Sequence, residues 1–168
     1  MKLEKCMLQM DHLKKAVTRE SLIQTARYLP LPIEHVFDFV TTSGNWPLWH
    51  PASQAVTGQT TRPMQLGEQV VEDFCLAGYQ AVVTWTVNQH EAPYRWRIEG
   101  AIGGRVRGAI TYNLTPEISG TFFERTFVYR LQKRWESVID YLLFRRFMAA
   151  ESSLALRRLR EVMLAEIA

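Results

Sequence analysis

The sequence predicts an α+β fold in which a curved antiparallel sheet of about six to seven strands wraps around one long C-terminal helix. Short segments in the middle of the chain alternate apolar and polar residues, and glycine or proline separates them. By contrast, residues from about 135 to 167 contain neither glycine nor proline. A sheet with one apolar face needs a cover, and this last segment is the element long enough to provide it.

The first strand is predicted at residues 20–30, and two short helical pieces follow it. Residues 32–42 predict the first of these helices, because Pro32 has the backbone angle that suits a first helical position. Its apolar residues share one helical face: Ile33, Val36, Phe37 and Val40. Gly44 and Pro47 then interrupt the helix.

Six further strands are predicted at residues 52–60, 68–77, 79–89, 94–100, 106–116 and 121–134. The alternation is clearest in the third of these, where Val83, Trp85 and Val87 share one face. The glycine pair at 103 and 104 and the segment 116–120 predict hairpin turns. Such a succession of strands indicates antiparallel pairing with one buried and one hydrated face.

Residues 135–167 predict a single helix about 45 Å long. Apolar side chains recur there at helical spacing: Ile139, Leu143, Phe147, Ala150 and Leu154. Residues 1–18 do not continue any of these patterns and are expected to form an arm or a short helix. The domain itself is expected to span residues 19–168.

Charge and cysteine content favour a soluble, cytoplasmic protein. The net charge is +3, and acidic residues interleave with the arginines of the last segment, so no nucleic-acid binding is predicted. Cys6 and Cys75 match no disulfide or zinc spacing and are expected to be free thiols in a reducing compartment. There is no signal peptide and no membrane-spanning run. The sequence leaves open whether the protein is a monomer or a homodimer.

Several catalytic motifs are missing from the sequence. There is no GxSxG elbow, and the histidines show no HExxH or other metal-ligand spacing. The segment GAIGGRVRG is rich in glycine but lacks the GK[ST] of a phosphate-binding loop. No metal, no cofactor and no defined catalytic residue are therefore predicted.

Four segments together resemble the START-like or SRPBCC superfamily, whose fold is called helix-grip. They are LPLPIEHVFDFVTTSGNWPLWHP, LGEQVVEDF, ITYNLTPEISGTFFERTFVY and the final helix. The chain is most similar to the polyketide cyclase/dehydrase-like branch, over residues 20–167. The resemblance implies a deep cavity between the sheet and the long helix. It also implies a lipid, sterol, polyketide or other apolar ligand, and in some members cyclase or aromatase activity.

The stretch GNWPLWHPAS, residues 44–53, is too interrupted for an ordinary helix and too aromatic for an ordinary loop. In the family it resembles, a tryptophan-containing turn closes the short helices under the sheet. Trp46 and Trp49 are accordingly expected to pack as the floor or rim of the core. The alternative is that they line the mouth of the cavity, where His50 would be a pocket group.

Two charged residues fall on the apolar face of predicted strands. Arg125 shares its face with Phe123 and Phe127, and Glu72 shares its face with Phe74. A buried charge without a partner costs several kcal/mol. Three outcomes are open: Arg125 pairs with Glu72, Arg125 binds an anionic ligand, or a strand end or bulge lets Arg125 reach water.

The function predicted first is the binding of a lipid-like, polyketide-like or aromatic molecule in the cavity. Its expected contacts are Trp49, His50, Glu72, Phe74, Trp85, Trp96, Tyr112, Arg125 and Phe127. A second hypothesis is a cyclase or dehydratase, with the acid–base groups drawn from His50, Glu72, Tyr112 and Arg125. A third is a membrane- or protein-associated accessory protein that uses the basic final helix.

Overall fold

The computed structural model describes residues 20–102, 106–131 and 138–166. Its strands are β1 (Glu20–Leu29), β2 (Ser53–Gly58), β3 (Gln69–Leu76), β4 (Tyr79–Glu91), β5 (Arg95–Ile102), β6 (Val106–Glu117) and β7 (Gly120–Leu131). Its helices are α2 (Ile33–Thr41), the 3-10 turn η1 (Ser43–Asn45), α3 (Trp46–Trp49) and α4 (Val138–Ala165). The α+β prediction is thereby confirmed, including the two short helical pieces after the first strand.

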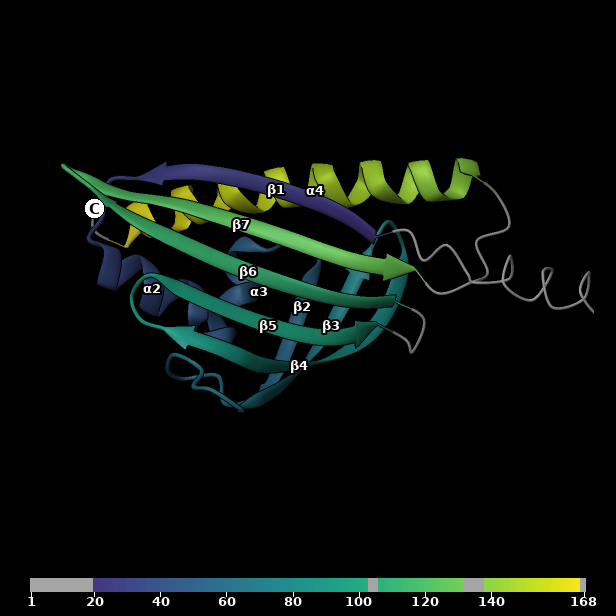
Figure 1. Ribbon diagram of the computed structural model, residues 1–168, viewed down its shortest axis with the longest axis horizontal. Helices are drawn as coiled ribbons and strands as arrows, with labels where there is room; N and C mark the ends of the chain where they lie inside the picture. The colour runs from purple at the N-terminus through teal and green to yellow at the C-terminus, as the bar shows by residue number, and fades with distance from the viewer. Residues whose placement is uncertain (1–19, 103–105, 132–137, 167–168) are drawn as a thin grey trace, which may run out of the picture.

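Within these residues, seven strands form one antiparallel sheet in the order β1-β7-β6-β5-β4-β3-β2 (Figure 1). Sequence neighbours pair along hairpins from β2 to β7, and β1 closes the other side by pairing with β7. β7 therefore lies inside the sheet, between β1 and β6. β4 contains a register shift between Val87 and Gln89, which is the kind of bulge that bends a strand.

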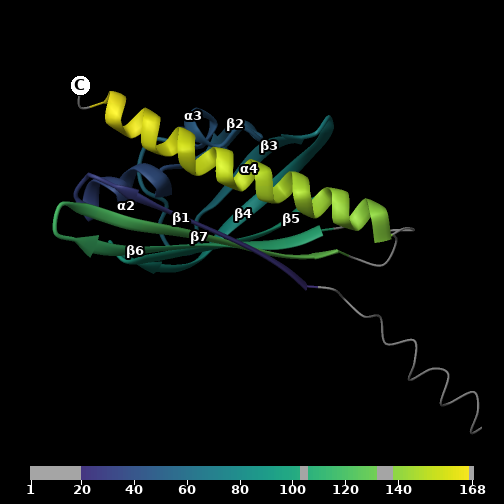
Figure 2. The same ribbon diagram turned by 90° about the horizontal axis from the view of Figure 1, so that it is seen from above.

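The long helix α4 crosses one face of the curved sheet (Figure 2). Its 28 residues correspond to a length of about 42 Å. The short helices α2 and α3 lie on the same side of the sheet as α4, near its C-terminal half (Figures 1 and 2). The core is thus enclosed between the sheet and this layer of helices.

Inward-facing residues of the strands supply most of the core. Along β3, burial alternates strictly from Gln69 to Phe74, as the alternation of apolar residues predicts. Two inward positions have no side chain at all: a Cβ on Gly100 would lie 2.7 Å from the ring of Trp85, and one on Gly108 would lie 2.7 Å from Phe127. These glycines let the aromatic rings lie flat against the neighbouring strands.

The buried face of α4 differs from the apolar stripe that the sequence suggests. Leu143 and Phe147 are about half exposed, whereas Met148, Leu159 and Met163 are buried. The buried face passes through Ser152, which is 1% exposed. A serine in the middle of this face interrupts its apolar pattern, so the period of hydrophobic residues indicated the wrong side of the helix.

Most predicted boundaries agree with the structure to within two residues. α2 begins at Ile33 with Pro32 as its cap, one residue later than predicted, and the predicted apolar face of this helix is buried. α4 ends at Ala165 rather than at residue 167. The predicted turn at residues 103–104, the end of the last strand at 132–134 and the helix start at 135 lie outside the described residues.

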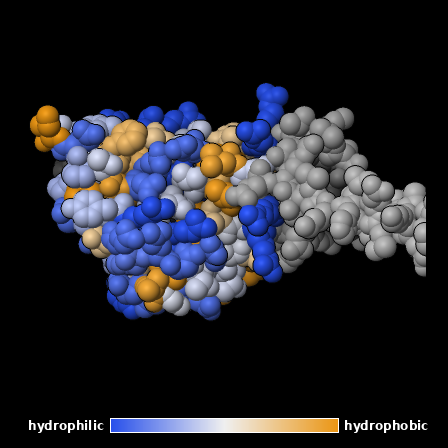
Figure 3. All heavy atoms as spheres, in the orientation of Figure 1, coloured by the Kyte–Doolittle hydropathy of each residue, from blue (hydrophilic) through white to orange (hydrophobic). Residues whose placement is uncertain are grey.

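The face of the molecule in Figure 3 is mostly hydrophilic, with separate hydrophobic patches. Among the described residues, no helix is long and apolar enough to cross a membrane.

Candidate functional site

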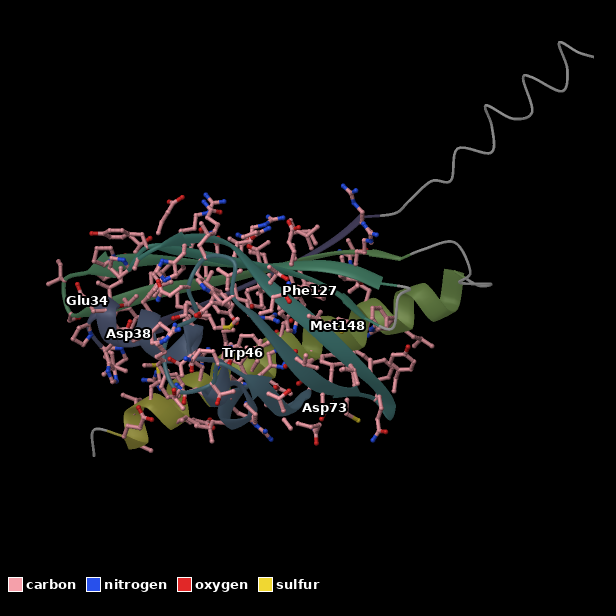
Figure 4. All side chains as sticks on the ribbon, turned by 90° about the horizontal axis from the view of Figure 1, so that it is seen from below. Glu34, Asp38, Trp46, Asp73, Phe127 and Met148 are labelled. Atoms are coloured by element: carbon pink, nitrogen blue, oxygen red, sulfur yellow. The ribbon has the colours of Figure 1, made fainter. Side chains whose placement is uncertain are left out.

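A cavity of about 30 Å³ lies between the sheet, α3 and α4. It is lined by Trp46, Trp49, His50, Glu72, Phe74, Trp85, Ile98, Ile110, Tyr112, Arg125, Phe127 and Met148. Figure 4 shows Trp46, Phe127 and Met148 between the sheet and the helix, with Asp73, Glu34 and Asp38 towards the outside. Five strands, α3 and α4 therefore contribute side chains to one cavity.

The cavity lining includes eight of the nine residues that the sequence predicts as ligand contacts. The exception is Trp96, which is fully buried one layer behind the cavity. Its ring stacks on Tyr112 with centroids 5.2 Å apart, and its indole N–H donates to the Met64 carbonyl at 3.3 Å. Trp96 thus supports a lining residue from behind.

Four lining residues are not among the ligand contacts that the sequence predicts: Trp46, Ile98, Ile110 and Met148. For Trp46 the first expectation is a place in the core, with the mouth of the cavity as the alternative, and the two isoleucines have the pattern of any inward strand residue. Met148 could have been found only from the correct buried face of α4, which Ser152 obscures.

Arg125 is 2% exposed in the middle of β7, where its pairing with β1 and β6 runs without a register shift. Its Nη1 donates to the Ser152 hydroxyl on α4 at 3.0 Å, and its Nη2 lies 3.1 Å from Nε2 of His50. The guanidinium carbon lies 5.9 Å from the centre of the Phe127 ring. One cation therefore connects the sheet, α4 and the segment that follows α3.

These contacts decide two of the three outcomes considered for Arg125. Arg125 does not reach water, because it lies at neither a strand end nor a bulge. Among the described residues, no carboxylate oxygen lies within 4.0 Å of its guanidinium, so the pairing with Glu72 is also wrong. The third outcome, an anionic ligand, stays a prediction.

His50 follows α3 and contacts the guanidinium through its ring. Burial and the positive charge of Arg125 lower the pKa of His50 well below its usual value, so the imidazole is neutral at pH 7. A guanidinium only donates hydrogen bonds. Nε2 of His50 must therefore accept the bond from Arg125, which places the imidazole proton on Nδ1.

Glu72 lies on β3 and is bound by a tryptophan rather than by an arginine. Its Oε2 accepts the indole N–H of Trp85 at 2.7 Å. Burial raises the pKa of Glu72, although Ser53, Trp85 and the charge of Arg125 act in the opposite direction. The carboxyl group is thus a weaker counter-ion than an exposed glutamate.

Tyr112 lies beside Arg125 on the neighbouring strand, at the paired position of β6. Burial raises the pKa of Tyr112 to about 12, even though the charge of Arg125 and a hydrogen bond to it favour the ionised form. Tyr112 therefore keeps its proton at neutral pH. Its ring lies 5.2 Å from the ring of Phe123 and 6.3 Å from that of Trp49.

The segment 44–53 combines the two roles that the sequence left open for it. Trp46 and Trp49 are 4% and 1% exposed, and the Trp46 indole N–H donates to the Val40 carbonyl at 3.1 Å. Both rings also line the cavity. The two tryptophans are thus core residues that form one wall of the candidate site.

The cavity is far smaller than the pockets that hold drug-sized ligands, which measure roughly 300–1,000 Å³. At about 30 Å³ it has room for two or three non-hydrogen atoms. Side chains therefore fill most of the space between the sheet and α4 in this conformation. Within the described ranges, no group of three or more histidine, cysteine or acidic side chains is placed to hold a metal ion.

Residues 22–164 match the protein family described as polyketide cyclase / dehydrase and lipid transport. No curated protein matches the chain.

Among solved structures, protein TTHA0849 from Thermus thermophilus is similar with a TM-score of 0.74 and 18% identity, over 88% of this chain and 100% of that one. A protein of unknown function from Staphylococcus aureus, SA2116, has a TM-score of 0.71 and 10% identity, over 90% of this chain and 98% of its own. DynU16, described as a putative protein in the dynemicin biosynthetic locus, has a TM-score of 0.59 and 17% identity. That match covers 84% of this chain and 46% of DynU16, so this chain spans about half of its length. These likenesses establish the helix-grip fold.

Proposed function

We propose that this chain, which belongs to the polyketide cyclase/dehydrase and lipid transport family, binds a hydrophobic small molecule between the sheet and α4. The observation that carries the proposal is the composition of the cavity wall. Aromatic and aliphatic side chains form most of it, and a few buried polar groups gather around Arg125. Apolar walls with a small number of placed polar groups are typical of small-molecule sites.

Binding requires side chains to move, because the cavity holds only a few atoms as it stands. Met148 is the lining residue on α4, and methionine is the apolar side chain that adapts most easily to a new neighbour. The ligand would enter where this part of α4 faces the sheet and would displace the side chain of Met148.

The first test is to identify what the purified protein carries. Native mass spectrometry would be followed by extraction with organic solvent and identification of the extract. A stoichiometric apolar molecule would support the proposal. A protein that carries nothing, and that also takes up no hydrophobic fluorescent probe, would contradict it.

A second test uses two buried methionines of α4. Met148→Ala enlarges the cavity, and Met163→Ala opens a hole in the core away from the cavity lining. Each substitution should cost about 2–5 kcal/mol of stability. Only Met148→Ala should raise the affinity for a hydrophobic probe, because only it makes room at the proposed site. Equal affinities in both variants would place the probe elsewhere.

The alternative is a cyclase or dehydratase that acts on a polyketide-like substrate. The observation that favours it is the opposite direction of two pKa shifts: burial raises the pKa of Glu72 and lowers that of His50. Such a pair can supply a general acid and a general base at the same pH. Mass spectrometry of β-hydroxyacyl and β-ketoacyl thioesters incubated with the protein would detect the loss of water. A rate unaffected by both Glu72→Gln and His50→Gln would rule out this chemistry.

A further inference from the structure

The polar end of the cavity contains buried hydrogen-bond donors that lack acceptors. Arg125 Nε, Trp49 Nε1 and His50 Nδ1 are buried without a hydrogen-bond partner among the described residues. His50 Nδ1 is a donor because Nε2 of the same ring accepts from Arg125. All three side chains line the cavity, and all three unpaired groups are N–H donors.

The same part of the cavity also carries a positive charge that no neighbouring negative charge balances. Arg125 carries a positive charge, and within the described part of the chain it forms no ion pair. Its direct partners, Ser152, the neutral His50 and the protonated Tyr112, carry no negative charge. Glu72 and Glu151 interact electrostatically with Arg125 but form no ion pair with it. Burial raises the pKa of both carboxyl groups, which makes them weaker counter-ions.

From this arrangement we infer that the ligand carries a carboxylate, and that Arg125, with the N–H groups of His50 and Trp49, forms the receptor for it. A carboxylate offers about four acceptor sites and one negative charge, which matches three unsatisfied donors and one unpaired cation. Water molecules can accept hydrogen bonds from the same donors, but they do not neutralise the charge. The inference deepens the proposed function and rests on it.

The size and composition of the cavity narrow the ligand class further. Its volume of about 30 Å³ suits a planar group of three non-hydrogen atoms better than a phosphate. Most of the other lining side chains are apolar, among them Phe74, Ile98, Ile110 and Met148. The expected ligand is therefore a monocarboxylic acid with an apolar body, which lies along this wall once Met148 has moved.

The test compares acids with alcohols of nearly the same shape. Binding of 1-naphthaleneacetate and 2-(1-naphthyl)ethanol, and of dodecanoate and 1-dodecanol, is measured at pH 7.5 by calorimetry. Each acid should bind about tenfold or more tightly than its alcohol. If the alcohols bind as well as the acids, the carboxylate inference is wrong while hydrophobic binding stands. If neither member of either pair binds, the proposed function fails as well.

Substitutions test whether the guanidinium of Arg125 causes the preference for acids over alcohols. In Arg125→Met the ratio of the two affinities should fall to about 1, whereas Arg97→Met, on the outer part of β5 beside Glu99, should keep the wild-type ratio. If the methionine variant does not fold, Arg125→Lys replaces it in the test. Lysine keeps the charge but lacks the Nε–H, so the ratio of acid to alcohol affinity should fall but stay above 1. An unchanged ratio in a folded Arg125 variant would overturn the assignment.

Discussion

At the scale of single residues, the site depends on charged and polar groups placed where apolar side chains are the rule. Arg125 and Glu72 both lie on inward positions of strands, and both are buried. Alternation along a strand detects such residues, because a polar side chain on the apolar face is conspicuous. Alternation does not give the partner, and here the partners were Ser152 and Trp85 rather than each other.

Glu72→Gln should stabilise the protein at pH 8. Burial raises the pKa of Glu72 in the folded state. At a pH where the carboxyl group of the unfolded chain is ionised, Glu72 therefore lowers the free energy of unfolding. Glutamine still accepts the bond from Trp85 but carries no charge. The gain should shrink as the pH falls through the folded pKa towards about 4.3, its unfolded value. Urea unfolding of both proteins between pH 8 and pH 5 measures this difference.

Glu68→Gln is the matched control, and its expected effect on stability has the opposite sign. Hydrogen bonds from Arg62 lower the pKa of Glu68, so this substitution should destabilise the protein at pH 8 rather than stabilise it. A gain from Glu72→Gln that stays the same at every pH would show that the ionisation of Glu72 is not its cause.

Trp49→Ala should cost about 3–5 kcal/mol of stability. The Trp49 ring is 1% exposed and contacts His50 and Tyr112, so its removal leaves a hole beside the cavity. Leu48→Ala is the natural control, since Leu48 is adjacent in sequence but 53% exposed. Chemical denaturation measures both. A loss below about 1 kcal/mol for Trp49→Ala would show that this ring is not part of the core.

At the scale of elements, the position of α4 over the sheet is set by a polar contact as well as by apolar packing. Ser152 lies in the centre of the buried helix face and accepts the hydrogen bond from Arg125 on β7. The same guanidinium also holds the segment after α3 through His50. Three elements that are distant in sequence therefore meet at one side chain.

Ser152→Ala should destabilise the protein by about 1.5–3 kcal/mol, because it leaves one N–H of a buried guanidinium without an acceptor. The next residue offers a close control. Ser153 is exposed, and among the described residues its hydroxyl bonds only the Ala149 carbonyl of its own helix, so Ser153→Ala should change stability by less than about 0.5 kcal/mol. Thermal and urea unfolding of the two variants provide the comparison. Similar effects in both would mean that the Arg125 contact does not fix the helix.

At the scale of the whole molecule, the fold encloses its core with a sheet of seven described strands and a single long helix. β1 is the first described element and pairs along its whole length with β7. Residues 1–18 are not among the described residues, and the expectation that they form an arm stays a prediction.

Removal of residues 1–18 should change the Tm by less than about 2 °C, because an arm contributes little to the core. Removal of residues 1–31 also takes away β1, which should prevent folding, since β7 would then lose one of its two neighbours. Differential scanning calorimetry of both truncated proteins tests this boundary. A large drop in Tm after the shorter truncation would show that the first 18 residues pack against the domain.

The sequence by itself determined the elements, their order and most of the cavity wall. It could do so because alternation in strands and the spacing of apolar residues in α2 are local properties of the chain. Tertiary structure alone decided which face of α4 is buried, that Trp96 lies behind the cavity, and that Arg125 bonds Ser152 and His50. Such features depend on contacts between distant residues, which no local pattern encodes; the two contacts of Arg125 join residues 27 and 75 positions apart. The space left in the cavity is likewise a property of packing, because it is the small remainder after all side chains have been placed.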